Sequence, residues 1–172
     1  MAEYMDVVDE RNRVQYRETR ETIHKTGLLH RGIHILIFNS DGQILLPFRS
    51  SSKDSSPNCY DTSLSEHCNV GETYDEAAHR GLKEELKIDN PTLKQIGVFK
   101  IDCGPTDKMI SAVYECLHDG EIHPNKDEIT DIKFKTIQEV KEMLRTKIDR
   151  FAPWTREILK HYFHQPSTIQ SI

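Results

Sequence analysis

The stretch SEHCNVGETYDEAAHRGLKEELKI, Ser65 to Ile88, decides how the rest of the chain is interpreted. Thr73 and Glu76 form the S/T-x-x-E pattern of a capping box, which marks the start of a helix. After it, small and bulky apolar residues recur with helical spacing, and YDTSLS before it is typical of a short strand. The stretch therefore predicts a strand, a loop and a helix from about Tyr74 to Lys87.

Acidic residues gather along this predicted helix. Arg80 and Glu84 are four apart and share a face, Glu85 follows, and Glu72 lies just before the helix. Carboxylate oxygens are the ligands that Mg²⁺ and Mn²⁺ prefer, and substrate phosphates often complete the shell of Mg²⁺. These residues predict a metal site for a diphosphate, although the same charges also suit an ordinary solvated helix with an i,i+4 ion pair.

The flanking sequence predicts a mixed sheet with further helices. EYMDVVDERNRVQY indicates an N-terminal hairpin, and GIHILIFNSDGQILLPFR indicates a second hairpin whose turn contains Asp41-Gly42. TLKQIGVFKID, MISAVYECL and DIKFKT have the composition of strands. A capping box at Thr136 and Glu139 predicts a helix to about Thr146, and Pro153 opens another. Local strand pairing around three helices indicates an α/β sandwich.

Composition limits the partners. The chain has 172 residues and a net charge of -5, so we expect no nucleic-acid binding and no attraction to an anionic membrane. An acidic start and the lack of a long apolar run favour a cytoplasmic location. The four cysteines have no CxxC spacing, which favours reduced thiols.

The stretch resembles the Nudix box, G-x5-E-x7-R-E-U-x-E-E-x-G-U, where U is a bulky aliphatic residue. The box is met in register, without a gap, by six positions, namely Glu72, Arg80, Leu82, Glu84, Glu85 and Ile88. Three positions depart from it: Glu66 replaces its first glycine, Gly81 its first helix glutamate and Lys87 its last glycine. The loss of a carboxylate at Gly81 matters most, because that glutamate is a metal ligand in the hydrolases; Glu66 is a candidate replacement.

The resemblance implies a Nudix α/β/α sandwich with a mixed sheet over 30–165. The hairpin and lead-in over 1–29 precede it, and the polar tail over 166–172 is expected to be frayed. The resemblance also implies that Glu84 and Glu85 hold Mg²⁺ or Mn²⁺ and that Glu72 and Arg80 support them. Downstream, Glu128 is the candidate base or additional ligand, or a solvated loop residue. The hairpin is a possible edge for a homodimer.

Longer segments look like the branch that contains type I isopentenyl diphosphate isomerases and related hydrolases. In that branch His30 and His67 match metal ligands, and His24 lies one residue from a third. Local hydrogen bonding is the alternative for His30, His34 and His67. The isomerase cysteine, however, falls at Ser65, where a hydroxyl is a far weaker acid than a thiol. The expected glutamates fall at Asp107 and Met109, and Cys68 is expected to pack as a small apolar residue.

Three hypotheses follow. The first is a Mg²⁺-dependent hydrolase of a phosphoanhydride in a nucleoside diphosphate derivative or an isoprenoid diphosphate. Its catalytic residues are expected to be Glu84, Glu85, Glu128 and Arg80, with substrate contacts from Arg49, Lys53 and His67 and with metal ligands Glu84, Glu85, Glu72, His67 and His30. The second is a divergent isopentenyl diphosphate isomerase. The third is a non-catalytic module that binds a diphosphate or a protein.

Overall fold

A computed structural model describes residues 2–172 of the chain. Its strands are β1 (Tyr4–Val8), β2 (Val14–Thr19), β3 (His30–Phe38), β4 (Ile44–Arg49), β5 (Leu64–His67), β6 (Leu93–Asp102), β7 (Lys108–Leu117), β8 (Ile129–Lys135) and β9 (Gln170–Ser171). Its helices are α1 (Arg20–Thr26), α2 (Tyr74–Gly81), α3 (Ile137–Thr146) and α4 (Pro153–Tyr162), with a π-helical turn η1 (Leu82–Leu86) after α2 and a 3₁₀ turn η2 (Ile148–Arg150).

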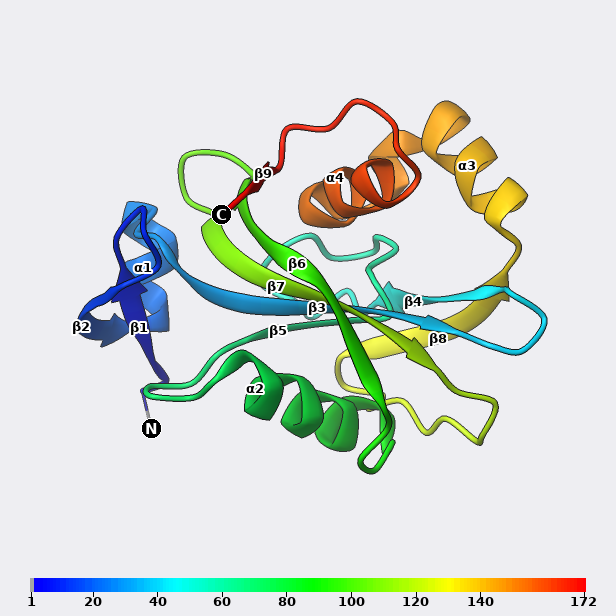
Figure 1. Cartoon of the computed structure of the whole chain (residues 1–172), viewed down its shortest axis with the longest axis horizontal. Coiled ribbons are helices and arrows are strands. Elements are labelled where there is room, and N and C mark those ends of the chain that lie inside the picture. The colour runs from blue at the N-terminus through cyan, green and yellow to red at the C-terminus, as the bar shows by residue number, and fades with distance from the viewer. Residues whose placement is uncertain (1) are drawn as a thin grey trace.

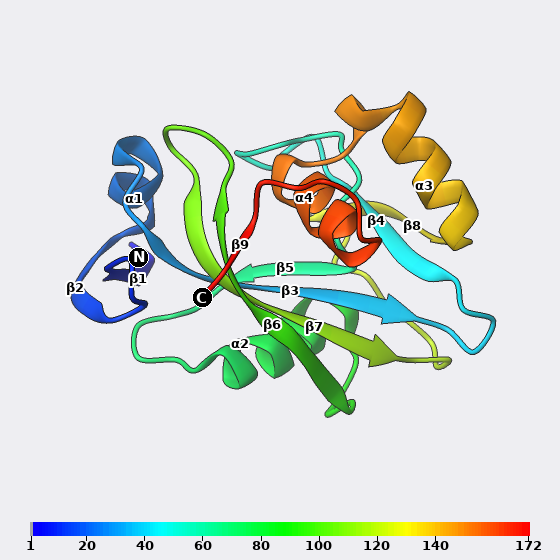
Figure 2. The same cartoon turned by 45° about the horizontal axis from the view of Figure 1, so that its top comes forward.

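The elements form three layers around a mixed sheet. Strands β3 and β7 are parallel, and the other pairings, including β6 with β7 and β5 with β3, are antiparallel. Helix α2 covers one face, and α3 and α4 cover the other (Figures 1 and 2). One apolar cluster lies under α2 and another under α3 and α4. The α/β sandwich predicted from sequence is confirmed.

The second predicted hairpin forms only at its turn. The backbone N–H of Asn39 donates to the carbonyl of Gln43, the N–H of Gly42 donates to the carbonyl of Asn39, and Gly42 adopts φ +71°. Beyond the pair Phe38 and Ile44, however, β4 separates from β3 and pairs with β8. The cause is β5, which takes the neighbouring edge of β3. The predicted hairpin is therefore present, as an antiparallel pair across the turn, but it is short.

The N-terminal hairpin is confirmed and attaches to the sheet where Val7 of β1 pairs with His30 of β3. The segment after it is helical, which the sequence analysis did not predict. Thr19 caps α1 by accepting from the backbone N–H of Thr22, and Gly27 ends it at φ +69°. Since Ile23 is the one buried residue of α1, the helix lacks the apolar repeat that signals a helix in sequence.

Both predicted capping boxes are present, at Thr73 and at Thr136. The predicted central helix is continuous from Tyr74 but changes after Gly81 into the π-helical turn η1, and Lys87 ends it at φ 58°. Lys87 thus adopts the left-handed conformation for which glycine is favoured. Turns of this π type occur mostly as short interruptions of α-helices and are frequent at functional sites.

The end of the chain differs from the expected frayed tail. Gln170 and Ser171 form β9 and pair with Lys100 and Phe99 of β6. Over the described residues, no helix has both the length and the apolar character needed to span a bilayer.

Candidate active site

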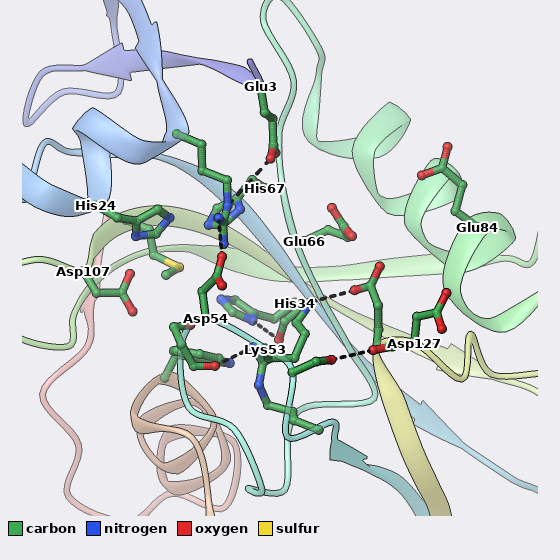
Figure 3. A pocket seen from close by; sticks show the side chains of 18 of the residues that line it. Glu3, His24, His34, Lys53, Asp54, Glu66, His67, Glu84, Asp107 and Asp127 are labelled. Atoms are coloured by element: carbon green, nitrogen blue, oxygen red, sulfur yellow. Dashed lines mark hydrogen bonds and ion pairs between the residues drawn. The ribbon is translucent and has the colours of Figure 1, made fainter. Parts of the chain in front are cut away.

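A cavity of about 530 Å³ opens beside the C-terminal half of β5, a size common for small-molecule sites. Its wall includes basic side chains, among them Arg20, Lys53 and Arg80, and a larger number of acidic ones, among them Glu66 and Glu128. Figure 3 shows His24 and His67 on one side of the cavity, and Glu66 lies between them and Glu84. The cavity thus combines positive charge for an anionic ligand with two groups of possible metal ligands.

Arg80 is fixed mainly by Glu72. Its Nε and Nη2 lie 2.8 Å and 3.0 Å from the two carboxylate oxygens of Glu72, and Nη2 also donates to the carbonyl of His67 at 2.8 Å. These bonds to Glu72 raise the pKa of Arg80 above its ordinary value. Glu72 also accepts from the backbone N–H of Asn69. The structure therefore places Glu72 as the main partner of Arg80 and as a partner of the loop backbone, while the same guanidinium also pairs with Glu66 and Glu84.

The consecutive residues Glu84 and Glu85 point in different directions. The side chain of Glu84 is 63% exposed and reaches Arg80 at 3.4 Å, the expected i,i+4 pair. Glu85 is 8% exposed and its carboxyl group is hydrogen-bonded to that of Glu66. Burial, this hydrogen bond and the charges of Glu66 and Glu128 raise the pKa of Glu85 to about 10. Glu66 of β5 and Glu128 of the loop before β8 therefore lie near enough to Glu85 of η1 for their charges to act on it.

Lys53 lies beside this acidic cluster. Its Nζ is 2.6 Å from Oε2 of Glu128 and it lines the cavity. Arg49 also lines the cavity, but its Nη1 pairs with Asp61 at 2.6 Å and its other nitrogens donate to the carbonyls of Ser55 and Ser56. Lys53 is therefore the freer of the two cations predicted to contact substrate, whereas Arg49 holds the loop that follows β4.

Three histidines from α1, β3 and β5 meet at the other side of the cavity. The ring centroids of His24, His30 and His67 lie 5.0 to 5.1 Å from one another, and one potential ligand atom from each lies within 4.8 Å of the others. Burial lowers the pKa of His30 to about 4, and it lowers those of His24 and His67 as well. The rings are neutral at pH 7, which is the form that binds metals.

The histidine cluster fits a metal ion. Nδ1 of His30 donates to the carbonyl of Leu28 at 3.0 Å, so Nε2 carries the lone pair. That Nε2 and Nε2 of His24 are buried and have no hydrogen-bond partner within residues 2–172. Oδ1 of Asp107, in the same cavity, is also buried and unpartnered there. His30 and His67 are the two histidines expected as ligands from the resemblance, and His24 joins them although it lies one residue from the position that the resemblance gives.

Ser65 occupies the position of the isomerase cysteine. Its hydroxyl donates to Oδ1 of Asp61 at 2.8 Å and accepts from Nδ1 of His34 at 2.9 Å. The Met109 side chain takes the place of an expected glutamate in the cavity, and a thioether has no proton to transfer. Cys68 is buried in the apolar cluster under α2, as expected, and burial raises its pKa to about 12. The two proton-transfer groups of an ordinary isomerase are therefore replaced.

A family model described as the NUDIX domain matches residues 28–162, and the chain belongs to the Nudix family. An isopentenyl-diphosphate Delta-isomerase 2 from Photorhabdus laumondii is 28% identical over 169 residues, covering 96% of this chain and 95% of that protein. An uncharacterized Nudix hydrolase from Pseudomonas aeruginosa is 32% identical over 133 residues, covering 77% and 78%. The sequence relatives thus carry both hydrolase and isomerase names.

Solved structures agree on the fold. The crystal structure of DR0079 from Deinococcus radiodurans has a TM-score of 0.76 and 25% identity, covering 94% of this chain and 98% of that one. The NUDIX domain of Shewanella oneidensis NrtR, solved with ADP ribose, has a TM-score of 0.61 and 13% identity over 78% of this chain and 86% of that one. The second likeness concerns the fold alone.

Proposed function

We propose that the chain is a divalent-metal-dependent hydrolase that cleaves a phosphoanhydride bond in a nucleoside diphosphate derivative or an isoprenoid diphosphate. The observation that carries the proposal is the meeting of Glu66, Glu128, Lys53 and Arg80 on the wall of one cavity, with Arg80 paired to Glu66 and Lys53 paired to Glu128. The buried Glu85 lies close enough to both glutamates for their charges to raise its pKa. Oxygen ligands of this kind suit Mg²⁺ or Mn²⁺, which when bound neutralises a diphosphate and orients water for attack on phosphorus.

The position of each residue in the cavity gives it a different proposed role. Lys53 and Arg80 offer positive charge to the phosphate oxygens, and Arg80 is kept in place by Glu72. Glu128 is the candidate base, since it lies at the cavity and is less buried than Glu85. In the reaction, a water oxygen forms a bond to phosphorus, the P–O bond to the bridging oxygen breaks, and the water proton passes to the base. Glu84 stays a predicted ligand, with an exposed side chain free to turn.

The test is phosphate or monophosphate release by the whole chain with Mg²⁺ or Mn²⁺, across nucleoside diphosphates, nucleoside diphosphate sugars and isoprenoid diphosphates. Glu85→Gln should lower kcat/KM by about 100-fold, the scale reported for metal-site partners. The matched control, Glu121→Gln, changes an exposed glutamate and should leave the activity unchanged. No release from any substrate by the wild-type protein would refute the proposal.

A divergent isopentenyl diphosphate isomerase is the second candidate, and the cluster of His24, His30 and His67 favours it. The cluster supplies the metal-binding half of such a site. Ser65 and Met109 leave its proton-transfer half without the usual acids. Deuterium incorporation from D₂O into isopentenyl diphosphate distinguishes this activity, and its absence would rule it out. A cytoplasmic location and a homodimer stay predictions from sequence.

A further inference from the structure

His34 is a buried histidine of β3 that lies outside the histidine cluster. It is 2% exposed, and it pairs with Ser65 of β5 on one side and with Val113 of β7 on the other. Its ring lines the cavity, between His67 and Lys53 in the view of Figure 3. Strands hold side chains more precisely than loops do, so the two ring nitrogens of His34 have fixed surroundings.

The hydrogen bonds of Ser65 determine which nitrogen of His34 carries the proton. Asp61, paired with Arg49 at 2.6 Å, is an ionised carboxylate that can only accept. The Ser65 hydroxyl donates to it at 2.8 Å and therefore accepts from Nδ1 of His34 at 2.9 Å. Burial lowers the pKa of His34 to about 4, so the ring is neutral at pH 7. Nε2 of His34 thus carries a lone pair and acts only as an acceptor.

This lone pair has no partner in the protein. Three histidine Nε2 atoms are buried without a hydrogen bond over residues 2–172, in His24, His30 and His34. The first two belong to the group whose ligand atoms can share a metal ion, and His34 does not belong to it. A buried acceptor without a partner is costly, so a site that contains one favours a ligand that brings a donor. The cavity wall therefore offers an acceptor that a bound molecule can satisfy.

The chemistry of a diphosphate limits what this donor can be. Ionised phosphate oxygens accept hydrogen bonds and do not donate them, so they cannot pair with Nε2 of His34. Lys53 and Arg80, the cations suited to phosphate, pair with carboxylates on the acidic side of the cavity. The hydrocarbon chain of an isoprenoid diphosphate has no N–H or O–H group. The donor then belongs to a polar organic part, such as the ribose or the base of a nucleoside diphosphate derivative.

We propose that His34 is a specificity-determining residue, whose Nε2 accepts a hydrogen bond from an N–H or O–H group in the organic part of the substrate. The site then selects a nucleoside diphosphate derivative over an unsubstituted isoprenoid diphosphate. The inference rests on the proposed function and chooses between the two substrate classes that the proposed function leaves open. It gives β3 a role that belongs neither to the box nor to the histidine cluster.

The first test follows the ring nitrogens of His34 in the wild-type, full-length chain by ¹⁵N NMR. ADP, CDP, GDP and UDP are the probes with donors in their organic part, and dimethylallyl diphosphate is the probe without one. At least one nucleoside diphosphate should move the Nε2 resonance of His34 toward that of a hydrogen-bonded nitrogen, and dimethylallyl diphosphate should leave it in place. A resonance that no nucleoside diphosphate moves, or that dimethylallyl diphosphate moves equally, would overturn the inference.

The second test measures binding of the same probes by calorimetry. The wild type should bind its preferred nucleoside diphosphate at least about tenfold more tightly than dimethylallyl diphosphate. His34→Phe replaces the imidazole with a ring that has no acceptor, and it should lose most of this preference while still binding dimethylallyl diphosphate. His118→Phe changes a partly exposed histidine that does not line the cavity, and it should keep the preference.

The outcomes separate this inference from the proposed function. An equal preference in His34→Phe and the wild type, or a wild type that prefers dimethylallyl diphosphate, contradicts the role of His34. If His34→Phe lowers the melting temperature and binds no probe, the ¹⁵N signals of the wild type decide. If the wild type selects a nucleoside diphosphate through His34 but hydrolyses none, the proposed function fails and the inference stands. Hydrolysis of both substrate classes without selection supports the proposed function and refutes the inference.

Discussion

The hydroxyl group of Ser65 lies 2.9 Å from Nδ1 of His34 and 2.8 Å from a carboxylate oxygen of Asp61. Asp61 is buried, which alone would raise its pKa, but the Arg49 guanidinium and several hydrogen bonds hold the pKa below its ordinary value. Asp61 is therefore ionised and can only accept, so Ser65 donates to it and accepts from His34. The proton on His34 then belongs on Nδ1.

This arrangement predicts a single tautomer for His34. Nε2 should carry the lone pair, consistent with its having no partner within residues 2–172. The ¹⁵N chemical shifts of the ring should show a protonated Nδ1 and an unprotonated Nε2 near pH 7. Ser65→Ala removes the acceptor and should shift the ring toward the other tautomer or a mixture. A protonated Nε2 in the wild-type protein would contradict the assignment.

His34 also predicts a pH dependence of stability. Burial lowers its pKa from 6.5 to about 4, so between pH 6.5 and 4 the unfolded chain binds more protons than the folded protein. The contribution of His34 to the free energy of unfolding should fall as the pH drops through this range, by about 1.4 kcal/mol per pH unit. The free energy of unfolding of His34→Asn, measured with denaturant and without metal, should change with pH less steeply than that of the wild type, by this amount. Parallel curves for variant and wild type would refute it.

The histidine cluster predicts binding of a transition metal. Three neutral imidazole groups suit such ions better than Mg²⁺, and Co²⁺ gives an absorption spectrum that reports its ligands. His24→Asn should weaken Co²⁺ binding by at least about tenfold. His118→Asn alters a partly exposed histidine outside the cluster and is the control. Equal affinities in both variants would show that the cluster holds no metal.

Asp61 predicts a large effect on stability. It accepts hydrogen bonds from Trp154 and Thr155 and pairs with Arg49 at 2.6 Å. Asp61→Asn leaves the guanidinium partly buried without its charge partner and should lower the free energy of unfolding by about 3–5 kcal/mol. Asp89→Asn breaks an exposed pair with Lys83 and should change it by less than about 1 kcal/mol. Urea unfolding of both variants measures the difference.

Local patterns in the sequence predict the fold well where they are strong. The capping boxes at Thr73 and Thr136 and the proline at Pro153 place three helices close to where they lie. Helix α1 is missed because it buries little apolar surface. The separation of β4 from β3 is also missed, since it depends on β5, which comes later in the chain and competes for the same edge.

In the candidate site, too, relationships between residues close in the sequence can be predicted, and those that depend on tertiary packing cannot. Arg80 and Glu72 are close in the sequence and meet in the structure as expected. The different directions of Glu84 and Glu85, and the position of Glu66 opposite Gly81, depend on how the helix packs against β5. No local pattern records which residue of a strand faces which turn of a distant helix, so these relationships need the tertiary structure. The catalytic roles of Glu84 and Glu128 stay predictions.

Helix α1 lies before the boundary of the family match, which starts at residue 28. His24 comes from this helix, and Arg31 of β3 ties the preceding hairpin to the sheet through the side chain and carbonyl of Asn12. A fragment trimmed to the family boundary would retain the central sheet and the helix of the box while losing one of three imidazole groups. The shortest unit that preserves the cavity wall is therefore longer than the shortest unit recognisable as the family's domain.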